Sequence, residues 1–152
     1  MSGAGFLIYK KNKFNENSFL LLKAIDNENK LGNKCFDIPK GGVDPGETEY
    51  ISAVRELEEE AGLTLEDIEI LKDDNMNPVS FYVPAEDHAE RLSLMIGKIK
   101  DESLSKITLN KNPYKEHSSF TWKSCYKCEN ICLKYLKDTF NIGEFLIKNH
   151  ER

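Results

Sequence analysis

The segment RELEEE places Glu56, Glu58, Glu59 and Glu60 directly after Arg55. Like charges this close repel, and like pairs three or four residues apart destabilise a helix. One explanation is a solvated acidic helix face, the usual meaning of a charge run. The other is a site for a hard divalent cation, which binds several carboxylate oxygens and often keeps water ligands. A bound cation would turn the repulsion into shared attraction.

The glutamates lie in the strongest helix prediction of the chain, from about Thr48 to Ala61. Thr48 is a suitable N-cap residue, and Gly62 is a suitable residue to end the helix. At about 100° per residue, one side of this helix is expected to face the core. That side consists of Tyr50, Val54, Leu57 and Ala61. The opposite side consists of Ser52, Glu56, Glu59 and Glu60, with Glu58 solvated at the flank.

The wider segment from Gly41 to Leu63 has a fixed spacing. It reads glycine, five residues, glutamate, seven residues, Arg-Glu, an aliphatic residue, one residue, Glu-Glu, one residue, glycine and an aliphatic residue. The segment GGVDPGETEYISAVRELEEEAGL therefore resembles the Nudix box, and every fixed position of the 23 residues matches. So many set positions make the pattern far more specific than a lone glycine motif.

The resemblance implies a fold and a cofactor. The fold is the Nudix-type α/β/α sandwich, with a mixed β-sheet between helices. The cofactor is Mg²⁺ or Mn²⁺, with Glu56, Glu59 and Glu60 as ligands. Gly41 would add a backbone carbonyl, and Glu116 in a distal loop would add a further carboxylate.

The resemblance also implies catalytic and structural roles. The family hydrolyses nucleoside diphosphates linked to another group, by attack of water on phosphorus. Arg55 is expected to orient Glu47 or Glu59, while Glu47 and Gly62 are structural residues of the box. The residues implied in catalysis are Arg55, Glu56 and Glu116. Either Glu56 or Glu116 can be the general base.

Segments outside the box resemble the asymmetric diadenosine tetraphosphate hydrolases, which release ATP and AMP. These segments are AGFLIYKK with SFLLLKA, IPKGGVDPGE, and YKEHSSFTW, in which His117 and Trp122 match. Lys40 and Lys98 are candidate phosphate contacts, because a lysine is a compact positive charge. The candidates for base stacking are Tyr82, Tyr114, Phe120 and Tyr135.

Two positions depart from that branch. Gly42 stands where the branch usually has a histidine, and Leu94 stands about where it has a base-stacking tyrosine. Other substrates therefore stay open: ADP-ribose, a dinucleotide coenzyme, or an RNA 5′ end. A non-catalytic nucleotide-binding module is a further alternative, which the intact box disfavours.

Composition limits the class of protein. The 152 residues suit one domain, residues 1–152, and the order of strands, helix, strands and helix indicates an α/β domain. A net charge of −5 argues against nucleic-acid binding by bulk charge. No apolar run is long enough for a membrane span and the N-terminus lacks a signal peptide. We expect a cytoplasmic monomer that binds a small-molecule nucleotide.

The remaining predictions concern the other elements and the cysteines. Strands are expected at 4–11, 18–25, 35–39, 68–71, 79–83, 92–99 and 118–125. One helix is expected from Glu129 to about Asn149, with Gly143 as a possible interruption. Cys125, Cys128 and Cys132 superficially suggest zinc, but no second pair of ligands exists. With three histidines in the chain, a histidine-based metal site is not expected either.

Overall fold

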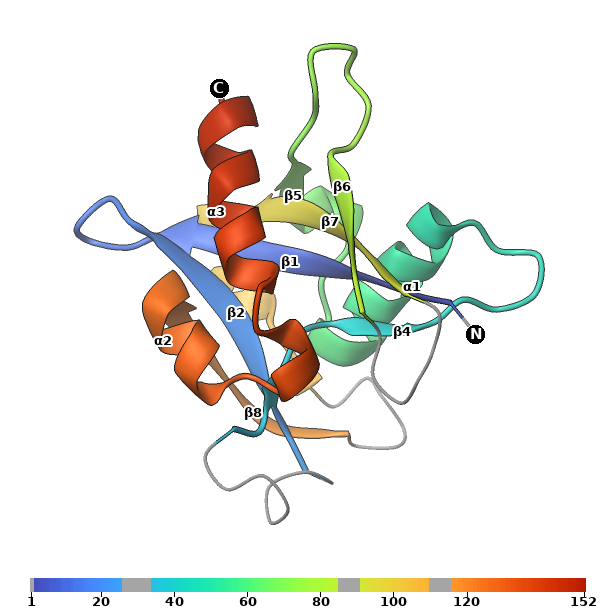
Figure 1. The fold of residues 1–152 in the computed structure, drawn as a ribbon, viewed down its shortest axis with the longest axis horizontal. Helices are drawn as coiled ribbons and strands as arrows, with labels where there is room; N and C mark the ends of the chain where they lie inside the picture. Colours follow the sequence, from blue (N-terminus) through green and yellow to red (C-terminus); the bar gives the residue numbers. More distant parts are fainter. Residues whose placement is uncertain (1, 26–33, 85–90, 110–115) are drawn as a thin grey trace.

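β1 (Gly3–Lys11) runs through the middle of a mixed sheet in the computed structural model, which describes residues 2–25, 34–84, 91–109 and 116–152 (Figure 1). Within these ranges the sheet has eight strands. The others are β2 (Asn17–Ala24), β3 (Phe36–Asp37), β4 (Lys40–Gly42), β5 (Ile68–Ile70), β6 (Ser80–Val83), β7 (Leu92–Ile99) and β8 (His117–Ser124). The α-helices are α1 (Glu49–Ala61), α2 (Cys125–Ile131) and α3 (Thr139–His150). Short 3₁₀ turns are η1 (Leu65–Asp67), η3 (Asp101–Lys106) and η5 (Lys134–Leu136).

The pairing of β1 makes the sheet mixed and places the glycine-rich segment. β1 is parallel to β7 and antiparallel to β2 and β4, and Gly5 lies opposite Lys40. A Cβ atom on Gly5 would lie 2.3 Å from the carbonyl oxygen of Pro39. Glycine at this position therefore lets β4 approach the central strand closely.

The sheet has a hydrophobic core on each face. Alternation along β1 sends Ala4, Phe6 and Ile8 to the core under α1, and Leu7 and Tyr9 to the core under α2 and α3. Figure 1 shows α3 in front of the sheet and α1 on its other side. The predicted α/β/α sandwich with a mixed sheet is confirmed.

The boundaries of α1 follow the predicted capping residues. The side-chain oxygen of Thr48 accepts a hydrogen bond of 3.1 Å from the backbone N–H of Ile51. Gly62 has φ +73°, a left-handed conformation that glycine adopts without a steric cost, and its N–H bonds to the carbonyl of Glu58. The predicted helix therefore begins and ends where its capping residues indicate.

The predicted faces of α1 are only partly right. Leu57 and Ala61 are fully buried, but Tyr50 is exposed and Ala53 occupies the core instead. The other side of the helix is not solvated either, because Ser52, Glu56 and Glu60 are buried as well. The covering atoms come from β4 and from the start of β8, which the local sequence around the helix does not predict.

The C-terminal prediction of one helix from Glu129 is wrong. The chain forms α2, leaves helical geometry at Cys132, and resumes in α3. A tertiary contact accompanies this break in the helix: the N–H of Leu133 donates a hydrogen bond to the carbonyl of Phe36 in β3. Gly143 does not interrupt α3. A Cβ atom there would lie 2.4 Å from Leu7, so this glycine brings the helix close to β1.

The predicted strands are present, although the one at 35–39 is reduced to the two residues of β3. All four cysteines are free thiols. Burial raises the pKa of Cys125 to about 12 and that of Cys132 to about 11, so both stay protonated at neutral pH. In the part of the chain that the structure describes, no three thiols gather as metal ligands.

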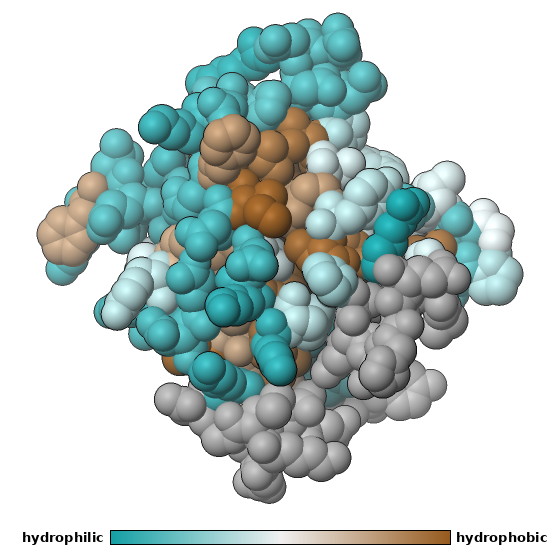
Figure 2. Space-filling view, in the orientation of Figure 1, coloured by the Kyte–Doolittle hydropathy of each residue, from teal (hydrophilic) through white to brown (hydrophobic). Residues whose placement is uncertain are grey.

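The face that carries α3 is largely hydrophilic, with apolar residues showing mainly near its centre (Figure 2). Among the described helices, none is long and apolar enough to cross a membrane.

Asp67 fastens the segment between α1 and β5. Its carboxylate accepts hydrogen bonds from the Thr64 N–H (2.9 Å), the Ser103 hydroxyl (2.7 Å) and the Lys106 ammonium (3.1 Å). Burial alone would raise the pKa of Asp67, but these donors outweigh burial and lower it to about 2. The ionised carboxylate is therefore part of the folded structure.

We expect Asp67→Asn to lower the free energy of unfolding by about 1–3 kcal/mol at pH 7, since it weakens several charge-assisted hydrogen bonds. The pKa of Asp67 is lower in the folded chain than in the unfolded chain. The stabilisation is therefore complete above about pH 4, declines as the pH falls, and is lost below about pH 2. Urea titrations at several pH values measure it, with the exposed neighbour Glu66→Gln as control. Equal stability of Asp67→Asn and wild type at pH 7 would contradict this role.

Candidate metal site and active site

The segment from β4 to the start of α1 folds over the helix that it precedes. Gly46, with φ +86°, allows the turn that returns the chain toward the helix. The N–H of Asp44 bonds to the carboxylate of Glu47 at 3.0 Å, and the Ser52 hydroxyl bonds to the Gly42 carbonyl at 3.2 Å. These contacts fix the loop against the first turns of α1.

Arg55 joins this loop to the helix. Its Nε and Nη2 donate to the two carboxylate oxygens of Glu47 at 2.9 and 3.0 Å, a bidentate arrangement. Nη2 also donates to the Gly42 carbonyl at 3.0 Å. The hydrogen bonds from Arg55 lower the pKa of Glu47. Since Nη1 lies 3.3 Å from Glu59, Arg55 contacts both of the glutamates that it was expected to orient.

Glu56 lies under β4. It accepts a hydrogen bond of 2.9 Å from Arg55 and is only 8% exposed. A Cβ atom on Gly41 would lie 2.1 Å from the Glu56 carboxylate, so only glycine leaves room for that carboxylate here. Burial raises the pKa of Glu56, and the nearby charge of Glu59 adds to the effect.

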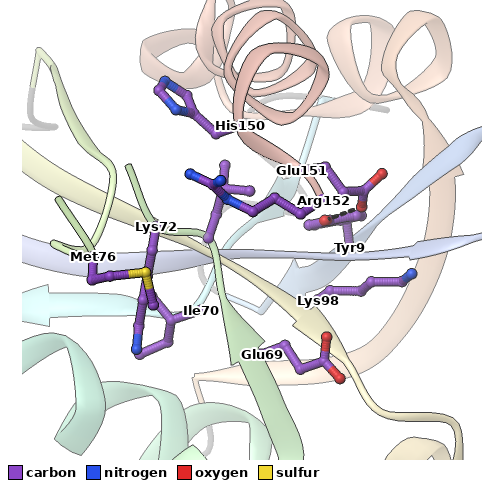
Figure 3. A pocket seen from close by; sticks show the side chains of 10 residues that line it. Tyr9, Glu69, Ile70, Lys72, Met76, Lys98, His150, Glu151 and Arg152 are labelled. Atoms are coloured by element: carbon purple, nitrogen blue, oxygen red, sulfur yellow. Dashed lines mark hydrogen bonds between the residues drawn. The ribbon is translucent and has the colours of Figure 1, made fainter. Parts of the chain in front are cut away.

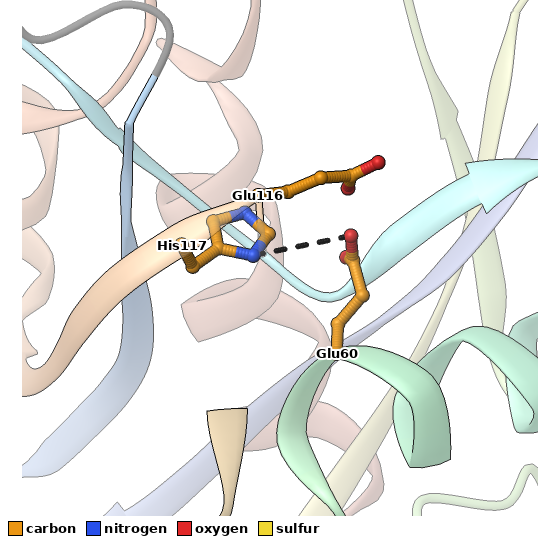
Figure 4. Close-up of side chains that lie close together, drawn as sticks. All are labelled: Glu60, Glu116 and His117. Atoms are coloured by element: carbon orange, nitrogen blue, oxygen red, sulfur yellow. Dashed lines mark ion pairs between the residues drawn. The ribbon is translucent and has the colours of Figure 1, made fainter. Parts of the chain in front are cut away.

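Glu60 is the most enclosed carboxylate of the site, at 3% exposure. Its Oε1 accepts the backbone N–H of Lys40 at 2.9 Å, while its Oε2 lies 3.9 Å from Nδ1 of His117. Burial, together with contact with Glu116, raises the pKa of Glu60 to about 10. Figure 4 shows Glu60 on α1 directed toward Glu116 and His117 at the start of β8.

These residues fit a divalent cation. One ligand atom from each of Glu60, Glu116 and His117 lies within 4.8 Å of the others, a group that could hold one metal ion. Glu56 and Glu59 lie on the same helix and share Arg55. Buried carboxylates that face one another keep high pKa values until a cation offsets their charge. The carboxylate oxygens of this group therefore suit a divalent cation such as Mg²⁺ or Mn²⁺.

A profile of the NUDIX domain family matches residues 1–123. The chain belongs to the NUDIX domain family. Among curated proteins, the asymmetrical bis(5′-nucleosyl)-tetraphosphatase of Caenorhabditis elegans is 40% identical over 73 residues, which are 48% of this chain and 49% of that protein. An RNA pyrophosphohydrolase of Erythrobacter litoralis is 50% identical over 42 residues, 28% of this chain and 24% of that protein. Both alignments thus span half or less of these Nudix relatives.

Solved structures extend the Nudix likeness to nearly the whole chain. The crystal structure titled as a C. elegans Ap4A hydrolase binary complex has a TM-score of 0.66 at 26% identity, covering 97% of this chain and 93% of that one. The NUDIX domain of Shewanella oneidensis NrtR, solved with ADP ribose, has a TM-score of 0.59 at 12% identity, with coverage of 98% and 86%. The second likeness is one of fold alone.

Lys40 lies next to the Nudix glutamates but is turned toward other partners. Its backbone binds Glu60, whereas its ammonium lies 3.4 Å from Oδ2 of buried Asp37 and 5.5 Å from the ring centroid of Tyr135. The Tyr135 hydroxyl donates to Oδ1 of Asp37 at 2.5 Å. The half-buried ring of Tyr135 therefore has a structural explanation, and its predicted stacking on a base stays a prediction.

Lys98 is not brought to the glutamates. It lines a separate pocket with Tyr9, Glu69 and Glu151 (Figure 3). It lies opposite Tyr9 on β1, four residues or about 13 Å along the strand from the level of Lys40. A phosphate contact by Lys98 at the metal site is therefore not supported by its position.

The other stacking candidates are spread out. Tyr82 on β6 is half exposed, with the Arg91 guanidinium 4.1 Å from its ring centroid, and Phe120 on β8 is partly exposed three residues after His117. Tyr114 lies outside the described residues. The sequence analysis considered His117 only as a possible fourth ligand of a cysteine zinc site, and it did not group His117 with Glu60, although its position next to Glu116 was a visible signal.

We expect Gly41→Ala to displace Glu56 or the loop, because a Cβ atom would overlap the Glu56 carboxylate. Mg²⁺ or Mn²⁺ should raise the melting temperature by binding the folded state, and this rise should be smaller in Gly41→Ala. We expect the metal affinity of the variant to fall by at least about tenfold. Thermal melts with and without metal measure the change.

Gly46→Ala is the matched control for the loop. It strains a backbone with positive φ but places its Cβ in open space. It should lower stability while retaining the response to metal. An undiminished metal response in Gly41→Ala would contradict the placement of Glu56.

Proposed function

We propose that this protein is a metal-dependent pyrophosphohydrolase that cleaves a phosphoanhydride bond in nucleoside polyphosphates. The observation that carries the proposal is the convergence of Glu60 of the Nudix box with the distant Glu116, beneath a loop that Arg55 and Glu47 hold in place. Membership of the NUDIX domain family supports the same reaction class.

The residues of the site would have different roles in this reaction. Glu56, Glu59, Glu60, Glu116 and the carbonyl of Gly41 would hold Mg²⁺ or Mn²⁺. The cation, when bound, offsets phosphate charge and makes water a better nucleophile. Arg55 fixes Glu47 and Glu56 relative to the loop. Glu116 is exposed and Glu56 is largely enclosed, and either carboxylate can accept the proton of the attacking water.

The proposed substrate is a dinucleoside polyphosphate, with diadenosine tetraphosphate and water giving ATP and AMP. Support comes from the likeness to the C. elegans Ap4A hydrolase over 97% of this chain. The local likeness to an RNA pyrophosphohydrolase favours RNA 5′ ends as the second candidate. The net charge of −5 disfavours a long RNA substrate. A cytoplasmic, monomeric enzyme remains our prediction.

The deciding experiment is a substrate panel with purified protein and Mg²⁺ or Mn²⁺. Diadenosine tetraphosphate, ADP-ribose, a dinucleotide coenzyme and a triphosphorylated RNA are incubated separately, and the products are resolved by anion-exchange chromatography. Fast release of ATP and AMP in equal amounts supports the proposal. Faster cleavage of another compound would make that compound the assigned substrate. If none of the four compounds is cleaved, the result would favour a non-catalytic binding module.

Variants of neighbouring glutamates test the site itself. Glu60→Gln and Glu59→Gln should each lower kcat at least about 100-fold, because even residues that only support metal ligands commonly contribute 10- to 100-fold. Glu58→Gln should remain active, since Glu58 is exposed on another side of α1. Steady-state kinetics on the preferred substrate, with circular dichroism to confirm folding, gives the comparison. Normal turnover by Glu60→Gln would overturn its assignment as a ligand.

A further inference from the structure

His117 presents a buried imidazole to the candidate metal site. Its side chain is 6% exposed, and its Nδ1 lies 3.9 Å from Oε2 of Glu60. That distance is too long for a hydrogen bond. Among the described residues, no hydrogen-bond partner is recorded for the ring. The second carboxylate nearby belongs to Glu116, the residue that precedes it (Figure 4).

β8 is irregular directly after His117, and Glu116 lies just before the strand, so regular alternation along β8 does not separate these two side chains. In a regular strand successive side chains point to opposite faces. Here Ala24 of β2 lies opposite His117, while the adjacent Lys23 lies opposite Ser119, so β8 contains one extra residue, Ser118. Such bulges redirect side chains and often lie beside active sites. Before the strand begins, the Glu116 carbonyl is held by the N–H of Ile25 at 3.0 Å.

The spacing suits coordination rather than a direct contact. At metal–ligand distances near 2.1 Å, two ligands of one octahedral ion lie about 3.0 Å apart when adjacent and about 4.2 Å apart when opposite. The separation of 3.9 Å between Nδ1 of His117 and Oε2 of Glu60 lies below the larger value, so one ion placed between the two atoms can reach both. Since the N–H of Lys40 occupies Oε1 of Glu60, Oε2 is the oxygen left facing the imidazole.

We propose that Glu60, Glu116 and His117 form a mixed oxygen and nitrogen site for a divalent first-row transition-metal ion. Imidazole binds such ions well, whereas Mg²⁺ prefers oxygen ligands alone. His117 therefore makes this site select Mn²⁺ or Co²⁺ over Mg²⁺. The inference deepens the proposed function, on which it rests for the role of the ion, and its test involves no nucleotide.

The direct test is pulsed electron paramagnetic resonance of the Mn²⁺-loaded wild-type protein. The experiment compares protein made with natural histidine and protein made with ¹⁵N-labelled histidine. A nitrogen coupling that changes with the label shows that a histidine binds the ion. Bound Mn²⁺ without any histidine coupling would overturn the proposal, and this result requires no variant to fold.

Two histidine variants identify the ligand. His117→Gln should lose the nitrogen coupling, and His150→Gln, in the separate pocket lined by Tyr9, should retain it. In calorimetric titrations, His117→Gln should lower the affinity for Mn²⁺ and Co²⁺ at least about tenfold, but it should change the affinity for Mg²⁺ less than about threefold. Equal weakening of all three metals would indicate a structural role instead. A catalytically inactive protein with an intact histidine coupling would refute the proposed function and leave this inference standing.

Discussion

One guanidinium shared among carboxylates organises the site. Arg55 lies within 3.3 Å of carboxylate oxygens of Asp44, Glu47, Glu56 and Glu59, and it also binds the carbonyl of Gly42. The bidentate contact to Glu47 fixes the guanidinium plane, which fixes the loop and the helix relative to each other. The close approach of Gly41 to Glu56 depends on this arrangement. A lysine could not reproduce it, because it offers a single point charge.

Burial of the remaining carboxylates would make the proposed site depend on a cation. Glu56 and Glu60 are enclosed, and burial raises the pKa of both. Among the described contacts, Arg55 donates a hydrogen bond to Glu56 but none to Glu60. The enclosed oxygens of Glu60 instead face the backbone N–H of Lys40, Glu116 and His117. A cation at Glu60 would favour the ionised carboxylate and hold α1 against the start of β8. In the proposed site, metal binding and local packing would therefore be coupled.

Local features of the sequence could be predicted, and distant contacts could not. Thr48 and Gly62 define α1 because capping depends on adjacent backbone. The roles that the box spacing implies for its glutamates stay predictions. The burial of Glu60 depends on β4 and β8, and the helix break at Cys132 depends on Phe36. Helical periodicity carries no information about such partners, so it placed Tyr50 in the core and did not indicate that Glu56 and Glu60 are buried. The bulge directly after His117 is likewise a property of strand pairing.

The positions of the lysines constrain how substrate charge can be balanced. Alternation along β7 places Lys98 on the face that α3 covers, whereas the glutamates of α1 lie on the other face. The ammonium of Lys40 already lies beside Asp37 and Tyr135. A polyphosphate bound at Glu56 and Glu60 would therefore meet mainly carboxylates in a chain with a net charge of −5. On the proposed function, we expect the cation to bind before or together with the substrate, because the phosphates and the glutamates would repel each other without it.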